Sequence, residues 1–379
     1  MLKANVFKFK HYISYLVIAI ATIIFSFLSL TGGLNSSNIY LLEKISIAII
    51  LAVSLSMVVG FLGELSLGHA GFMCVGAYLG GKTAVVLVNN FNLSHFPTLL
   101  ISVIVGGLVA ALFGIIIGLP ALRLRGDYLA IVTLAFGEIV RSIFMNSSDE
   151  SFGGSLGLKT IRYDKNHLFI IAFVLVLITL AVTQNLIRSK HGRAITAIRD
   201  NEIAAKATGI NVTKYKLVVF TVSSFFAGIA GVLYSFSNFT VQSTKFSYNY
   251  SIEILVMVVL GGMASINGSI VAATLITFLD VKLQTILTGN LAVLQDLFYA
   301  LILIVLIIYN NAPAFKGFRE KYNLKSFIKK FSKHNPATVN DDEAKWDRVP
   351  TKINVDEVLS VDIQISSPYT PDKPEKEEK

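Results

Sequence analysis

Long apolar stretches dominate this sequence and restrict the folds open to it. An α-helix needs about 20 residues to cross a hydrocarbon layer about 30 Å thick. Eight stretches of roughly that length lie at 12–30, 39–60, 70–89, 97–119, 128–145, 167–187, 217–236 and 290–309. Charged residues make up 15% of the chain, whereas soluble domains carry roughly a quarter. We therefore predict an all-α fold, a polytopic bundle of membrane-spanning helices.

A ninth apolar stretch, from Ile252 to Leu287, is too long for one span. Its 36 residues would extend about 54 Å as a straight helix. Glycines and a short polar run at 261–268 interrupt the helical pattern. We expect a broken or re-entrant helix there, which brings the total to about ten segments.

A second glycine-rich interruption lies at 60–71, between two predicted spans. It holds four glycines, two ionisable groups and a serine. Paired interruptions in the two halves of a membrane protein are typical of a solute path, although close packing of small residues against a neighbouring helix is the alternative. The predicted path residues in the two interruptions are Glu64, Ser66, Gly68, His69, Gly261, Gly262 and Asn267.

Two further charges, Glu138 and Arg141, lie inside the apolar stretch 128–145. Residues three apart share one face of a helix, and an unpaired charge at membrane depth is costly. We expect the two side chains to neutralise each other or a partner helix. A polar station on the solute path is the other interpretation.

The net charge of +9 is unevenly distributed, with +14 in residues 1–333 and −5 in 334–379. With the N-terminus inside, the predicted inner stretches hold 19 Lys and Arg residues and the outer loops four. This distribution obeys the positive-inside rule, so the basicity requires no nucleic acid partner. It predicts two cytoplasmic termini. The first stretch is longer than a usual signal-peptide core and no A-x-A site follows it, so we expect a retained span rather than a cleaved signal peptide.

The sequence divides into a membrane domain, 1–333, and an acidic tail, 334–379. The tail holds five of the eight prolines and reads as a disordered cytoplasmic segment. An alternation of Val361, Ile363 and Ile365 with polar residues suggests instead a strand that docks on a cytoplasmic partner.

No motif in the chain indicates a cofactor or a metal. Gly76–Thr83 matches the P-loop pattern literally, but it lies in an apolar run without the buried strand and amphipathic helix that a P-loop joins. Cys74 is the single cysteine, which excludes a disulfide framework, and no Cys/His pair has zinc spacing.

The longest predicted inner loop, 188–216, contains an alanine-rich run that ends at Gly209. Asp200, Asn201 and Glu202 precede the alanines and a glycine closes the run, which predicts a short cytoplasmic helix over this region. Such a helix could lie on the membrane surface, or in a groove of another protein.

Several motifs together resemble the permease subunits of bacterial ABC importers for branched-chain amino acids, specifically the LivM-type partner of the LivH/LivM pair. They are the stretches 63–72, 119–134, 197–205 and 251–262, spread in family order through the region 39–309. The resemblance implies half of a heterodimeric channel, which receives substrate from an extracytoplasmic binding protein. Its other partners would be a LivH-type permease and two cytoplasmic ABC ATPases, in the bacterial inner membrane.

The resemblance also assigns residues. Glu202, Ala205 and Gly209 match the core of the importer coupling motif, which implies that this helix presses into an ATPase groove. The later Leu-Pro of that motif is absent. A branched-chain amino acid would need apolar surface and a few dipoles along its path, which the glycine breaks could supply. The permease itself is not expected to be an enzyme.

Three alternatives remain at this point. Similar permeases carry urea, short amides or other amino acids. An ion-coupled secondary transporter would use Glu64, His69 and Glu138 as a relay but leaves the 188–216 loop without a role. An integral membrane enzyme would need a cluster of metal ligands, or a nucleophile with its base, which the sequence lacks.

Overall fold

The computed structural model describes residues 2–286 except positions 32, 34, 125 and 164, together with the isolated positions 297, 300, 301, 304 and 308. Contacts divide the chain into the units Met1–Asn311 and Ala312–Lys379, and the following description concerns the first. The rest of the predicted span 290–309, the predicted domain boundary at 333/334 and the tail 334–379 lie outside the described residues.

The long helices agree with the predicted spans. They are α1 (Leu2–Leu30), α2 (Ser36–Ser56) with its π-helical continuation η1 (Met57–Leu62), α3 (His69–Phe91), α4 (His95–Ala121), α5 (Asp127–Met145), α7 (Lys165–Arg188), α10 (Val212–Ser237), α11 (Tyr248–Gly261) and α12 (Ile266–Ile286). Seven helices in the described part of the chain are long and apolar enough to cross a membrane, and α11 is a shorter apolar helix. The helical fold class is thereby confirmed, and the P-loop-like octapeptide lies within helix α3.

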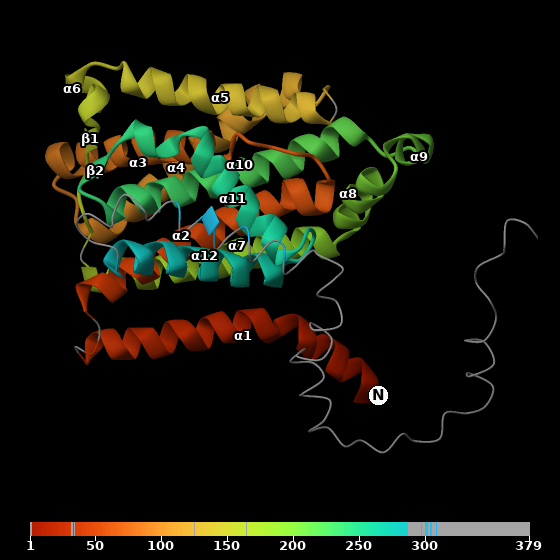
Figure 1. Ribbon diagram of the computed structural model, residues 1–379, viewed down its shortest axis with the longest axis horizontal. Coiled ribbons are helices and arrows are strands. Elements are labelled where there is room, and N and C mark those ends of the chain that lie inside the picture. Colours follow the sequence, from red (N-terminus) through yellow and green to blue (C-terminus); the bar gives the residue numbers. More distant parts are fainter. Residues whose placement is uncertain are drawn as a thin grey trace, which may run out of the picture. The chain divides into compact units, whose positions relative to one another are not determined.

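The long helices lie side by side along one common direction (Figure 1). Helix α10 packs against α4, α3 and α2 and occupies the middle of the bundle. Glycines permit these close approaches. A Cβ on Gly76 would lie 2.5 Å from the Cα of Gly228, so neither position accepts a side chain without moving a helix.

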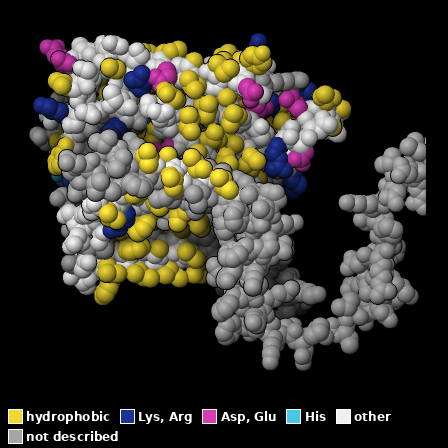
Figure 2. All heavy atoms as spheres, viewed as in Figure 1, with side chains coloured by type: hydrophobic (Ala, Val, Ile, Leu, Met, Phe, Trp, Pro, Cys, Tyr) yellow, Lys and Arg dark blue, Asp and Glu magenta, His cyan; other side chains and the backbone are white. Residues whose placement is uncertain are grey.

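Helix α4 also has a face that no described part of the chain covers. Leu100, Ile104, Leu108, Leu112 and Ile116 follow one another at intervals of four residues, and each is about half exposed. Apolar side chains spread over the visible surface of the described part (Figure 2). Contiguous apolar surface of this extent suits lipid or another membrane-embedded subunit.

Short elements mark the two ends of the bundle. One end carries α6 (Asp149–Phe152), η2 (Gly154–Leu156) and an antiparallel pair of strands, β1 (Leu158–Lys159) and β2 (Thr240–Val241), followed by η3 (Ser243–Phe246). The opposite end carries α8 (Lys190–Asp200) and α9 (Glu202–Ala207), between α7 and α10 (Figure 1).

Candidate functional site

The loop between α7 and α10 forms two helices, where the sequence predicts one. Asn201 interrupts them with an extended backbone, φ −158°. Its side-chain oxygen accepts hydrogen bonds from the N–H groups of Ile203 and Ala204, each at 3.0 Å. An asparagine that satisfies these N–H groups starts a new helix instead of continuing the old one. Gly209, at φ +84°, follows α9 as predicted.

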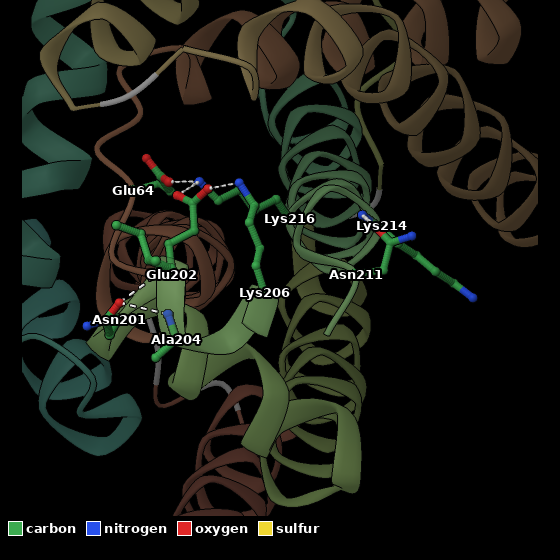
Figure 3. Close-up of polar contacts among 9 residues, drawn as sticks. Glu64, Asn201, Glu202, Ala204, Lys206, Asn211, Lys214 and Lys216 are labelled. Atoms are coloured by element: carbon green, nitrogen blue, oxygen red, sulfur yellow. Dashed lines mark hydrogen bonds and ion pairs between the residues drawn. The ribbon is translucent and has the colours of Figure 1, made fainter. Parts of the chain in front are cut away.

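A network of four charged side chains anchors this loop to the bundle. Lys216, near the start of α10, is 2% exposed. Its ammonium group contacts the carboxylate of Glu64 and lies 3.1 Å from Glu202 Oε2. Lys206 Nζ lies 2.8 Å from the other oxygen of Glu202. Figure 3 shows Lys216 between two carboxylates, that of Glu64 from the first glycine break and that of Glu202 from α9.

The network is electrically balanced, with two carboxylates and two ammonium groups. Burial of one lysine without partners would be costly, so the pairing is a condition for placing Lys216 there. Lys206 and, to a smaller extent, Lys216 lower the pKa of Glu202 below its ordinary value of 4.5, because they favour the charged carboxylate. Glu202 is therefore ionised at neutral pH.

Helix α8 adds a second connection, to the first glycine break. Arg199 Nη1 donates a hydrogen bond to the carbonyl oxygen of Gly60, 3.2 Å away. Gly60 lies near the end of η1, where carbonyl groups have no partner within the helix. At Gly63, which has φ +80°, an added Cβ would lie 2.6 Å from the Cγ of Arg199. The loop between α7 and α10 is thus in direct contact with the first glycine break.

The two glycine breaks also touch each other. A Cβ on Gly60 would lie 2.5 Å from the backbone nitrogen of Ala264. The second break turns sharply between α11 and α12, with Gly262 at φ +91° and Ala264 at φ +63°. Contacts therefore run without interruption from α8 and α9 through the 57–68 segment to the 262–265 turn.

The predicted path residues fall into different surroundings. Glu64 is part of the charged network, and Gly261 packs against Gly268 at the second break. His69 is 2% exposed, and its Nε2 shares a 2.8 Å hydrogen bond with Ser54. Ser66 is buried. Gly68 lies against Thr133, and Asn267 is exposed.

Glu138 and Arg141 form the expected ion pair. Arg141 Nε lies 2.8 Å from Glu138 Oε2, and each side chain is somewhat over a quarter exposed. The other carboxylate oxygen of Glu138 accepts a hydrogen bond from the N–H of Tyr248 at 2.9 Å. The pair therefore ties α5 to the first residue of α11, and Glu138 contacts both of the partners that the sequence suggested.

The three residues that match the importer coupling motif differ in their exposure to solvent. Ala205 is 4% exposed and packs within its own chain, so it lies on the buried face of α9. Gly209 is exposed. Ile203, which is absent from the motif match, is 72% exposed on the same helix. Ile203 is therefore a large apolar side chain that α9 leaves exposed.

Lys216, Arg199 and Ile203 are not among the predicted residues. Lys216 counts only as one of many basic residues in the sequence, and its burial becomes visible when α10 is packed. Ile203 gave a weak signal, since it is a large apolar residue among small and charged ones in a loop. The contact of Arg199 with a carbonyl group carries no sequence signal.

Comparison with known proteins identifies the class of protein to which this chain belongs. A family model described as the permease component of branched-chain amino acid transport systems matches residues 37–309. The match covers most of the chain, so the chain belongs to this family of membrane permeases. The apolar helices and the family together make it a multi-pass membrane protein.

Individual relatives carry the name LivM. The high-affinity branched-chain amino acid transport system permease proteins LivM of Salmonella typhimurium and Escherichia coli K12 are each 38% identical over 262 residues, 61% of this chain and 60% of the relative. A probable LivM of Methanocaldococcus jannaschii is 26% identical over 267 residues, 62% of this chain and 76% of the relative. The chain spans about 60% of the length of the first two. No solved structure matches it.

Proposed function

We propose that this chain is a permease subunit of an ATP-driven importer and carries branched-chain amino acids into the cell. The names of its LivM relatives, which refer to branched-chain amino acid transport, support the solute class. The proposed partners are a LivH-type permease, two cytoplasmic ABC ATPases and an extracytoplasmic binding protein. In this assignment the chain lies in the bacterial inner membrane with both termini and the α8–α9 loop in the cytoplasm, and ATP is hydrolysed by the separate ATPases.

The observation that carries the proposal is the physical connection from α8 and α9 to the two glycine breaks. ATPases that close on ATP move whatever lies in their grooves. A displacement of α9 is transmitted through Glu202 and Lys216 to Glu64, and a displacement of α8 through Arg199 to Gly60. Both routes end in the 57–68 segment, which touches the 262–265 turn.

The same contacts give an ion-coupled relay less support. Glu64 is paired with a lysine, and His69 is hydrogen-bonded to a serine in a packed interior. These partners account for both groups as structural elements of the bundle. Urea, short amides and other amino acids stay open as solutes, and ligand binding to the external binding protein would choose among them.

The exposed side chain of Ile203 allows the coupling assignment to be tested. Ile203→Asp places a charge on the proposed ATPase contact while leaving the ion network in place. We expect the ATPases to be lost from the purified complex, and ATP-driven leucine uptake in proteoliposomes to fall at least tenfold. Co-purification and uptake are measured on the same preparations.

Leu156→Asp is the matched control, because Leu156 is 76% exposed in η2 at the opposite end of the bundle. It should retain the ATPases. Retention of ATPases and full uptake in Ile203→Asp would show that α9 is not the coupling element. Leucine uptake by the purified chain alone under an ion gradient would contradict the importer itself.

A further inference from the structure

A cavity separates α1 from α2 and α12. Helix α1 packs chiefly against α7, where the Tyr15 hydroxyl donates a hydrogen bond to the carbonyl oxygen of Leu180 at 3.2 Å. The cavity measures about 710 Å³, which is within the range of pockets that hold small molecules. Figure 2 shows hydrophobic side chains around a hollow on this face of the molecule.

The lining of the cavity is apolar except at two positions, Asn38 and Thr274. The Thr274 hydroxyl donates a hydrogen bond to the carbonyl oxygen of Ile270 at 2.8 Å, so it needs no further partner. Val271 and Phe278 of the lining are 67% and 47% exposed. Close-packed interiors leave few voids larger than a water molecule. The cavity therefore calls for an apolar occupant.

The size of the cavity favours a lipid chain over a further helix. Its lining on α12 runs from Ile270 to Phe278, a rise of about 12 Å. A helical segment of that length and about 10 Å across would need about 900 Å³, more than the cavity holds. An acyl chain is much thinner than a helix, and one leaflet of a bilayer offers about 15 Å of hydrocarbon depth.

A cation lies one helical turn beyond the cavity. The Nζ atom of Lys282 lies 5.9 Å from the ring centroid of Phe278, which lines the cavity. From Ile270 to Lys282 the helix rises about 18 Å, the hydrocarbon depth of one leaflet plus the start of its head-group layer. None of the ion pairs among the described residues includes Lys282.

We propose that this cavity is a phospholipid site, with one acyl chain between α1 and α12 and the phosphate at Lys282. The ammonium group complements the charge of a phosphate. The end of η1 touches the turn before α12 at Ala264, so α2 and α12 run in opposite directions. Asn38, near the start of α2, therefore lies at the same end of the cavity as Lys282. The lipid belongs to the leaflet at the β1–β2 end, and the inference is independent of the solute carried.

Native mass spectrometry tests the site by counting the phospholipids bound to the purified full-length chain. The delipidated chain is titrated with dioleoyl phosphatidylglycerol. We expect Ala21→Trp, which fills the cavity, and Lys282→Met each to weaken binding of the first lipid at least tenfold, about 1.4 kcal/mol. Lys282→Arg should keep most of the binding.

Two matched controls should bind like wild type. Ile23→Trp adds the same ring to α1 at a position that is 68% exposed and outside the lining. Lys159→Met removes a lysine in β1, at the same end of the bundle. Phosphatidylglycerol should raise the unfolding temperature of wild type and of Ile23→Trp but not of Ala21→Trp, because a ligand stabilises only a fold that binds it.

A lipid without phosphate separates the two parts of the site. Dioleoylglycerol carries the same acyl chains and no phosphate. Wild type should favour phosphatidylglycerol over it at least tenfold, Lys282→Met should lose this preference, and Ala21→Trp should weaken both lipids. Inorganic phosphate should not compete. Competition by inorganic phosphate would show an ion site and overturn the proposal.

Three further results would overturn it. Equal binding by wild type, Ala21→Trp and Lys282→Met would show that the lipid lies elsewhere. Equal losses in Ala21→Trp and Ile23→Trp would place the effect in α1 and not in the cavity. A cross-link from Thr274→Cys to another membrane subunit in native membranes would show that a protein helix fills the cavity. If Ala21→Trp does not fold, Lys282→Met and its loss of lipid preference decide the question.

Discussion

At the scale of single residues, Lys216 connects the loop to the membrane bundle. It is the most buried member of the charged network, and its two carboxylate partners come from segments far apart in the sequence. The sequence placed Glu64 on a solute path and Glu202 on a coupling helix. Packing shows that Lys216 joins the two carboxylates. The sequence could not indicate this link, because neither the spacing of Glu64 and Glu202 nor their residue type marks them as partners of one lysine.

Lys216→Met should destabilise the protein because it leaves two carboxylates without their buried partner. Removal of one member of a fully buried pair costs about 3–5 kcal/mol. Glu64 and Glu202 are partly exposed, so we expect about 1–3 kcal/mol. Thermal unfolding in detergent measures this effect, and ATP-driven uptake should fall with it.

Lys214→Met is the control for this change. Lys214 lies two residues earlier in α10 and points away from the network (Figure 3), so its loss should leave unfolding and uptake unchanged. Addition of Glu64→Gln to Lys216→Met should recover part of the lost stability. If the double variant is no more stable than Lys216→Met alone, the ion pair is not the source of the effect.

At the scale of elements, the spans and the two glycine breaks were predictable, whereas the structure of the loop between α7 and α10 was not. Apolar length placed nine helices to within a few residues, except that α1 begins about ten residues earlier than the predicted stretch. The expected single coupling helix was wrong, because Asn201 caps a second one. Whether Asn201 caps a new helix or continues α8 depends on local backbone geometry. The alanine content, on which the prediction of one helix was based, does not show that geometry.

The contact between the two breaks belongs to this scale and is open to test. Gly60→Ala inserts a methyl group against the backbone nitrogen of Ala264. Backbone cannot rotate away as a flexible side chain would, so we expect a loss of about 1–3 kcal/mol in stability. Leucine uptake should fall further than stability alone explains, because the breaks would be held apart.

Gly137→Ala serves as the comparison, since the Cβ added there would meet its nearest neighbour, the backbone of Gly71, at an ordinary 3.7 Å. Both changes insert a methyl group at a glycine of the bundle. Uptake should survive in Gly137→Ala. Equal uptake in the two variants would show that close contact of the breaks is not needed for transport.

At the scale of the whole molecule, the described elements form one bundle with distinct ends. The α8–α9 loop occupies one end, and the β1–β2 pair with its neighbouring short helices occupies the other (Figure 1). The distribution of Lys and Arg predicts that the α8–α9 end faces the cytoplasm. Since Cys74 is buried, the native chain has little background reactivity, and single cysteines can report this orientation.

Thr208→Cys and Leu156→Cys place a thiol at opposite ends of the bundle, both at exposed positions. In intact spheroplasts a membrane-impermeant maleimide should label Leu156→Cys alone. Permeabilised membranes from which the ATPases have been removed should give labelling of both variants. Wild type should stay unlabelled throughout. Labelling of Thr208→Cys in intact spheroplasts would reverse the proposed topology.

The sequence by itself determined that the chain crosses a membrane many times, where most spans lie, and which loop resembles a coupling motif. These conclusions depend on hydrophobic length and local patterns, which act over neighbouring residues. Tertiary structure decided which distant residues meet, namely the Glu64–Lys216–Glu202 link and the contact of Gly60 with Ala264. Each joins residues from separate helices, and only the packing of those helices brings them within the few ångströms over which such contacts act.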